Sequence, residues 1–242
     1  MWEDRRWTVR ESHTIYETRW LRLREDWCTL PDGTELSAPW YVLEKDDYAL
    51  IVAVTAAREA VLVRLYKHGA GTVVTEFPAG FIDPGEDPVH AVRRELREET
   101  GFLADQVIPI GTLYASPSVL TNRCHIYWCP DLVDRVPPSP EPSERIEVLL
   151  RPWDELLHEV LQGRGFSDVS STAAFLLVHQ LMQGSGRDHS QVVGPGGDWK
   201  ELPTRGAHPV ARKYAGVLAR GLRPRAGGGW HTRRERDLFS EE

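Results

Sequence analysis

Runs of apolar, β-branched and aromatic residues recur along the first two thirds of the chain and predict a series of strands. Two of them, Tyr48–Thr55 and Ala60–Tyr66, are almost continuously apolar, which is typical of strands buried on both faces of a sheet. The turn-forming sequence Pro31-Asp32-Gly33 separates two earlier candidates. The other expected strands are His13–Leu21, Leu23–Leu30, Glu35–Leu43, Thr72–Glu76, Val107–Tyr114, Arg123–Cys129 and Ile146–Arg151.

Three further segments are predicted to be helices. Val169–Gln183 has apolar residues at helical spacing, and Trp153–Gln162 precedes it. The third helix, Val89–Thr100, has complete end signals: Asp87 as N-cap, Pro88 at the first helical position and Gly101 as a left-handed C-cap. This mixed order of strands and helices predicts an α+β fold, with helices on both sides of a mixed sheet and a small antiparallel sheet at the N-terminus.

The composition of the chain changes after Gly184. The sequence from there to the end is rich in Gly and Arg, and it lacks apolar periodicity apart from one possible amphipathic helix over Pro209–Leu222. We therefore expect three parts: an N-terminal sheet over residues 1–45, a main domain over 46–184, and a mostly flexible tail over 185–242. A contact of the basic tail with RNA or a protein partner is the alternative to a solvated tail.

The charge of the chain is divided between its body and its tail. The tail over 185–242 holds 11 Lys and Arg against 7 Asp and Glu, so the totals of 29 and 36 leave the rest of the chain with a net charge of −11. An acidic body argues against general nucleic-acid binding. Cys28, Cys124 and Cys129 form no Cys-x-x-Cys pair or even-numbered framework, so we expect reduced, buried thiols; a metal role for Cys124, His125 and Cys129 is the alternative. Neither a secretory signal nor a membrane span is visible, so we expect a cytoplasmic protein.

The sequence of residues 80–102 contains the most specific pattern in the chain, G-x5-E-x7-R-E-U-x-E-E-x-G-U, where U is a bulky apolar residue. Each fixed residue type has a background frequency of about 5–7%, so this match arises by chance in fewer than about one chain in 10⁵. Its fixed positions are Gly80, Glu86, Arg94, Glu95, Glu98, Glu99 and Gly101.

Three glutamates of this pattern crowd one side of the predicted helix. Glu95 and Glu99 are four residues apart, and Glu98 is three from Glu95, so their like charges repel. Acidic side chains also oppose the helix dipole at a C-terminal end. Bound Mg²⁺ or Mn²⁺ relieves both penalties, because hard cations prefer oxygen ligands. A solvated acidic face is the alternative, but the preceding glycine-punctuated loop favours an ion or phosphate.

The pattern is the signature box of the Nudix hydrolases, and residues 12–183 resemble that family. The flanking sequences EAVLVRLYKHG and EFPAGFIDPGE, together with Pro117 sixteen residues after Gly101, are similar to its ADP-ribose pyrophosphatase branch. The resemblance implies an αβα sandwich around a mixed sheet and metal-dependent hydrolysis of ADP-ribose to AMP and ribose 5-phosphate. It also implies a homodimer in which the N-terminal sheet reaches over the neighbour's site.

The resemblance further implies roles for individual residues. The metal ligands would be Glu95, Glu98, Glu99 and the carbonyl of Ala79, with Glu86 a supporting carboxylate and Arg94 orienting Glu98. The general base would be Glu144 or, as second choice, Glu141, so the expected catalytic residues are Glu144, Glu98 and Glu141. The expected substrate-binding residues are Trp20, Trp40, Lys67 and Pro117.

One departure from the branch leaves the substrate open. The sequence GAGTVVTEFPAG lacks the arginine that often precedes this segment, and Lys67 and His68 are the nearby basic residues. Another nucleotide sugar, such as GDP-mannose or UDP-glucose, is therefore compatible with the sequence. A Nudix-fold binding or regulatory module without turnover is a further alternative, although such modules usually lose carboxylates of the box, and this chain retains all of them.

Overall fold

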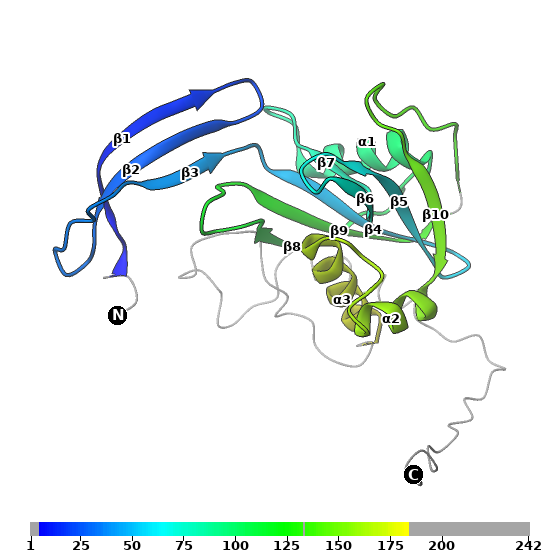
Figure 1. Ribbon diagram of the computed structural model, residues 1–242. Helices are drawn as coiled ribbons and strands as arrows, with labels where there is room; N and C mark the ends of the chain where they lie inside the picture. The colour runs from blue at the N-terminus through cyan, green and yellow to red at the C-terminus, as the bar shows by residue number, and fades with distance from the viewer. Residues whose placement is uncertain (1–4, 133, 184–242) are drawn as a thin grey trace, which may run out of the picture.

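A computed structural model of the chain describes residues 5–132 and 134–183, arranged as two sheets and three helices (Figure 1). The N-terminal strands are β1 (Thr8–Glu17), β2 (Arg22–Thr29) and β3 (Trp40–Glu44). The remaining elements, in chain order, are β4 (Tyr48–Thr55), β5 (Glu59–Lys67), β6 (Thr72–Glu76), β7 (Ala79–Phe81), α1 (Pro88–Thr100), β8 (Ile108–Tyr114), β9 (Arg123–Leu132), β10 (Glu147–Pro152), α2 (Trp153–Leu161) and α3 (Val169–Gln183).

The central sheet is mixed and has the strand order β10-β5-β4-β9-β8, with β6 paired to β5 and β7 paired to β4. Strands β4 and β9 run parallel, with Tyr48 opposite Cys124, and the other pairs are antiparallel. The short β7 pairs Gly80 with Ala49 and so attaches the start of the glycine-rich loop to the centre of the sheet. That attachment fixes where α1 begins.

Strand β4 is buried on both of its faces because successive side chains point to opposite sides of a strand. Leu50 and Val52 pack in one core with residues of α2 and α3, such as Trp153 and Phe175. Their neighbours in sequence, including Ile51, pack in a second core with Ala91, Val92 and Leu96 of α1. The two cores make an αβα sandwich, and they confirm the α+β fold with helices on both sides of a mixed sheet (Figure 1).

The N-terminal strands form a separate three-stranded antiparallel sheet with the order β1-β2-β3. It extends away from the central sheet, and β1 is its outer strand (Figure 1). Every residue of β1 is exposed. The small N-terminal sheet is thus present as predicted, and within residues 5–132 and 134–183 the outer edge of β1 has no strand paired to it.

The predicted boundaries are wrong by more than one residue at three places in this sheet. The first strand begins at Thr8 and not at His13. The first strand ends at Glu17, earlier than expected, because Thr18 N–H donates to the Leu21 carbonyl at 2.9 Å and turns the chain. The third strand starts at Trp40 and not at Glu35, since Pro39 has no N–H to give to a ladder. Strand β7 was not predicted, while Tyr48–Thr55, Thr72–Glu76 and Val169–Gln183 match the structure residue for residue. The predicted helix at Pro209–Leu222 lies outside the described residues.

Candidate active site

The box helix α1 is fixed at both ends by the residues that predicted it. The Val89 N–H donates to Oδ1 of Asp87 at 2.8 Å, and Pro88 occupies the first turn. At the other end Gly101 has φ 78° and its N–H donates to the Arg97 carbonyl at 2.9 Å. The predicted caps are therefore confirmed, and they set the rotation of the helix about its axis.

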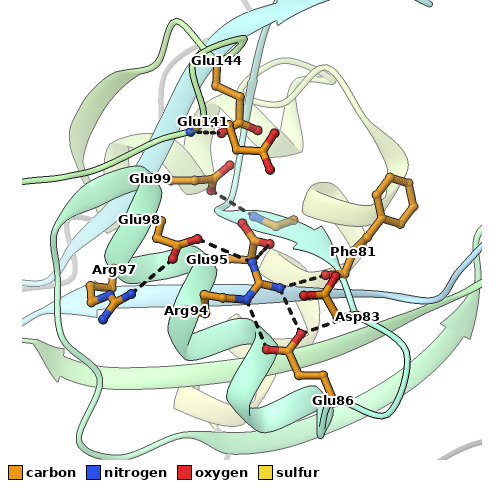
Figure 2. Close-up of polar contacts among 11 residues, drawn as sticks. Phe81, Asp83, Glu86, Arg94, Glu95, Arg97, Glu98, Glu99, Glu141 and Glu144 are labelled. Carbon is orange, nitrogen blue, oxygen red and sulfur yellow. Dashed lines mark hydrogen bonds and ion pairs between the residues drawn. The ribbon is translucent and has the colours of Figure 1, made fainter. Parts of the chain in front are cut away.

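Arg94 ties the loop before α1 to the helix (Figure 2). Its Nε and Nη2 donate to the two oxygens of Glu86 at 3.1 and 3.0 Å, and Nη2 also donates to the Phe81 carbonyl at 3.1 Å. Glu86 in turn accepts the Asp83 N–H at 3.1 Å, and the hydrogen bond from Arg94 lowers the pKa of Glu86. Glu86 thus supports the loop, whereas Arg94 holds chiefly Glu86 and Glu95, with Glu98 at 3.5 Å.

The three glutamates of the helix differ in burial and in partners (Figure 2). Glu99 is 3% exposed, and its Oε2 accepts the Ala79 N–H at 3.2 Å. Burial, followed by the charge of Glu95, raises the pKa of Glu99 well above its usual range. Burial also raises the pKa of Glu95, although Arg94 at 2.7 Å acts in the opposite direction. These carboxylates repel one another and have lost much of their hydration, so a bound cation would stabilise their ionised forms.

The oxygen atoms of Glu95, Glu98, Glu99 and the Ala79 carbonyl are ligands that a hard divalent cation prefers. Two of these carboxylates, however, point towards arginines. Arg94 engages Glu95, and Arg97 lies 3.2 Å from Glu98. Within the described part of the chain, no three acidic, histidine or cysteine side chains converge tightly enough to form a metal centre as they stand. The carboxylates of Glu95 and Glu98 can turn from the arginines towards an ion by rotation about their side-chain torsions. Glu95, Glu98, Glu99 and the Ala79 carbonyl are the groups that would hold the ion.

The loop after β9 is anchored on the C-terminal end of α1. The Val136 N–H donates to the Gly101 carbonyl at 2.8 Å, and the Ser139 N–H donates to the Glu98 carbonyl at 2.9 Å. These bonds satisfy helix carbonyls that have no partner inside the helix. They also bring Glu141 and Glu144 over the box glutamates (Figure 2), and the charge of Glu144 contributes to the raised pKa of both Glu95 and Glu99.

A cavity of about 670 Å³ opens between this loop, the box helix and the start of α3. The predicted site residues that line it are Trp20, Lys67, Ala79, Glu95, Glu98, Glu141 and Glu144. Trp40 and Pro117 line a separate hollow of about 430 Å³, where the Trp40 Nε1–H donates to the Ser118 carbonyl at 3.0 Å. The structure therefore brings most of the predicted residues into one cavity. Glu99 is buried behind that lining, and Trp40 and Pro117 lie outside it in a single chain.

The cavity also contains side chains that were not predicted from the sequence, among them Lys45, Glu76, Asn122 and Asp168. Glu76 pairs with Lys67 at 2.7 Å, and burial raises its pKa. The position of this acid immediately before Phe77-Pro78-Ala79 was a signal, because a charged group at the end of an apolar strand marks a site. Asp168 had a signal too, since it precedes a helical pattern and is a good N-cap.

Comparison with known proteins agrees with this geometry. The αβα sandwich and the acidic cavity together define the class of fold to which known families are compared. The family model described as NUDIX domain matches residues 45–168, and the model described as Nucleoside diphosphate sugar hydrolase N-terminal domain matches residues 7–46. The chain belongs to the Nudix family.

Individual relatives resemble parts of the chain. It is 31% identical over 129 residues to ADP compounds hydrolase NudE of Escherichia coli (strain K12), which covers 52% of this chain and 67% of that one. It is 30% identical over 82 residues to ADP-ribose pyrophosphatase of Bacillus subtilis (strain 168), covering 34% and 44%. A crystal structure of ADP compounds hydrolase superposes with a TM-score of 0.65 at 23% identity, over 75% of this chain and 97% of that chain, which supports the fold. The match thus spans 67% of the length of the first of these curated relatives and 44% of the second.

Proposed function

We propose that this chain is a metal-dependent hydrolase that cleaves the diphosphate of a nucleoside diphosphate linked to a sugar, with ADP-ribose as the favoured substrate. The observation that carries the proposal is the cluster of Glu95, Glu98 and Glu99 beside a cavity that Glu144 overlies. Relatives named for ADP-ribose and ADP compounds support the choice of substrate. The products would be AMP and ribose 5-phosphate.

The reaction needs a divalent ion, for which we propose Mg²⁺ with Mn²⁺ as a substitute. Such an ion, when bound, neutralises phosphate oxygens, activates the attacking water and stabilises the leaving group. The water oxygen forms a bond to one phosphorus, and the bond from that phosphorus to the bridging oxygen breaks with its electron pair on the oxygen. The chain's part is to hold the diphosphate against α1 and to accept a water proton.

Glu144 is the proposed acceptor of that proton, and Glu141 is the second choice. Both line the cavity from the anchored loop, and the charge of Glu144 reaches Glu76, Glu95 and Glu99. The Glu141 N–H donates to Oε2 of Glu144 at 3.2 Å, so the loop itself orients that carboxylate. Substrate would also contact Trp20 and Lys67 in the same cavity.

The substrate is tested by incubating the full chain with ADP-ribose, GDP-mannose and UDP-glucose, with Mg²⁺ or Mn²⁺, and measuring release of nucleoside monophosphate. We expect the fastest release from ADP-ribose. Faster release from GDP-mannose or UDP-glucose would keep the reaction and change the substrate. No release from any of them with either metal would contradict the proposal and favour a binding module.

The base is tested by a matched pair of variants in the same loop. We expect Glu144→Gln to lower kcat about 10²–10⁴-fold, as for loss of a general base, with little change in metal affinity. Glu141→Gln should leave kcat nearly unchanged. A change of KM alone in Glu144→Gln would assign that residue to substrate binding, and a reversed order of the pair would make Glu141 the base.

We also propose that two copies of the chain associate through the N-terminal sheet. Strand β1 is a fully exposed outer strand, and Val9, Ile15 and Tyr16 expose apolar surface on it. An uncovered edge of this length favours pairing with another chain. Light scattering should give twice the chain mass for the full protein, and a monomer at assay concentration would contradict the dimer.

The proposed location is the cytoplasm, which the three buried, unpaired cysteines support. No helix within residues 5–132 and 134–183 has the length and apolar character that a membrane crossing requires. Fractionation of cells producing the chain should recover it with cytoplasmic markers, and its recovery in an exported fraction would contradict this location.

A further inference from the structure

Two oxygens in the central cavity's lining residues are buried without a hydrogen-bond partner. They are Oδ1 of Asn122 and Oδ2 of Asp168, and Nε1 of Trp128 is the one other such atom among the described residues. Buried polar atoms are rarely left without a partner, because each costs the free energy of its lost hydration. Both residues line the same cavity, so a small rotation of either side chain would turn its oxygen towards an occupant that donates a hydrogen bond.

One carboxylate oxygen of Asp168 accepts a hydrogen bond from the chain, and the other has no partner. It precedes α3 as its N-cap: Oδ1 accepts the Ser171 N–H at 2.7 Å, and the backbone carbonyl accepts from the Thr172 hydroxyl at 2.8 Å. Oδ2 is therefore an acceptor held in place by the cap, and a ligand that meets it must donate a hydrogen bond.

Asn122 belongs to the same part of the cavity. It is 5% exposed and stands two residues before Cys124, which pairs with Tyr48 across β4 and β9. The Tyr48 hydroxyl lies 2.6 Å from the Ser170 hydroxyl, two residues after Asp168. Burial raises the pKa of Tyr48, and the charge of Asp168 adds to that effect, as expected for near neighbours. Asn122, Tyr48, Asp168 and Ser170 thus form one polar wall.

We propose that this polar wall binds the hydroxyl groups of the sugar that is attached to the distal phosphate, with Asp168 as a residue that determines specificity for that sugar. The inference rests on the proposed function. Sugar hydroxyls are the donors that a diphosphate substrate offers next to its phosphates, and the wall has acceptors for them. A nucleobase needs a broad stacking face. Trp20 offers such a face, because its side chain is largely exposed.

Residues 69–80 contain no arginine that could bind the sugar. A guanidinium donates hydrogen bonds to the ring and hydroxyl oxygens of a sugar, whereas Asp168 accepts from the hydroxyl hydrogens. Specificity then depends on hydroxyl groups that point towards α3. A substrate without them leaves both buried oxygens unpaired, which is the strongest basis for rejecting an analogue.

The test compares two substrates that differ only at the sugar end: ADP-ribose and the methyl ester of ADP, which hydrolyses to AMP and methyl phosphate. Asp168→Ser keeps an N-cap hydroxyl and removes Oδ2. We expect it to lower kcat/KM for ADP-ribose about tenfold or more, mainly through KM, because a hydrogen bond to a charged group is lost. Its kcat/KM for the methyl ester should stay within about twofold. Asp154→Ser, an exposed acid at the start of α2, is the control and should change neither value.

The changes in kcat/KM with the two substrates distinguish a sugar contact from other roles of Asp168. Equal losses with both substrates would overturn the sugar contact and assign Asp168 to the nucleotide or to the fold, and no loss with either would make it a helix cap alone. If the unmodified protein releases AMP from neither substrate, the proposed function fails and this inference fails with it. If Asp168→Ser lowers the melting temperature strongly, Asp168→Asn replaces it, since it keeps the cap and removes the charged acceptor, and the same selective loss is expected.

Discussion

The carboxylate of Glu95 occupies the space that a side chain on Gly80 would need. A Cβ built on Gly80 would lie 2.1 Å from both Cδ and Oε1 of Glu95. The backbone of Gly80 has an ordinary φ, so the glycine is required by this close approach and not by its conformation. Strand β7 and helix α1 therefore meet with one proposed metal ligand, Glu95, directly against the backbone beside another, the Ala79 carbonyl.

Gly80→Ala is expected to displace Glu95 and to lower kcat/KM for ADP-ribose about 10²-fold, since small misplacements at a reacting centre cost this much. The melting temperature should change little, because the end of a flexible side chain can move aside. Gly69→Ala is the control: a Cβ there meets nothing within 4 Å, and both values should be unchanged. Near-native turnover of Gly80→Ala at saturating Mg²⁺ would contradict the role of Glu95 as a ligand.

The residues that the sequence located well are those whose geometry is set locally. Asp87, Pro88 and Gly101 determine where α1 begins and ends, and the spacing of the box then places its glutamates on one side. Short-range rules suffice for such an element. The same holds for the almost continuously apolar β4, whose burial follows from its sequence alone.

The residues that the sequence did not locate come together only through tertiary contacts. Asn122 and Asp168 are far apart in the chain, and they line one cavity because β4 and β9 pair in parallel while α3 packs on that face of the sheet. Strand β7 is too short to show a periodicity. Trp40 lies outside the central cavity because it stands at the start of β3 opposite Asp26, whereas Trp20 lies in the turn before β2 at the other end of the sheet.

The metal-free protein should lose stability as the pH rises from about 4.5. Burial raises the folded-state pKa of Glu76, Glu95 and Glu99 above their usual 4.5, so in this window the folded state holds protons that the unfolded state has released. The free energy of unfolding then falls with increasing pH until these groups ionise. Asp47 and Glu86 have lowered pKa values and act in the opposite direction only below their ordinary values of 3.8 and 4.5.

The measurement is urea unfolding in EDTA between pH 4.5 and 8, repeated with saturating Mg²⁺. We expect a decline in EDTA that Mg²⁺ removes, because a bound cation favours the ionised carboxylates. Glu99→Gln should reduce the decline, abolish turnover and leave the fold intact, whereas the exposed Glu155→Gln should behave as the unmodified protein. A metal-free stability that rises over this range would contradict the buried cluster.

The position of the loop that carries Glu144 should depend on Gly101 in two ways. Gly101 is the C-cap of α1, and the loop backbone also packs directly against it. Gly101 and Gly163 have similar left-handed conformations, with φ of 78° and 72°. Alanine therefore costs roughly 1–2 kcal/mol at either position. A Cβ on Gly101 would also lie 2.1 Å from the Val136 carbonyl oxygen, while one on Gly163 meets nothing within 4 Å.

Gly163→Ala should therefore lower the melting temperature by about 2–8 °C and leave kcat unchanged. Gly101→Ala should lower the melting temperature further and also lower kcat, because the backbone at Val136 must move and the anchored loop moves with it. Equal melting temperatures and equal kcat for the two variants would show that the loop is positioned independently of Gly101.

The aromatic residues Trp20 and Trp40 of the N-terminal sheet could either stack on a nucleobase or pack within the protein, and their surroundings differ. Trp20 lines the central cavity and is 60% exposed. Its ring is therefore available for stacking on a base. Trp40 is packed edge-on against Trp7, with ring centroids 5.2 Å apart, and lies at the second hollow. Of these two tryptophans, Trp20 is the one that lines the central cavity of its own chain.

We expect Trp20→Ala to raise KM for ADP-ribose roughly tenfold, since stacking on an aromatic ring contributes about 1–3 kcal/mol per base. It should also reduce the preference for ADP-ribose over UDP-glucose. Trp40→Ala should lower stability with a smaller change in KM, unless a second copy brings its own Trp40 to the cavity. That case is distinguished by measuring KM above and below the concentration at which light scattering detects the dimer. An unchanged KM for both nucleotides in Trp20→Ala would assign Trp20 to packing.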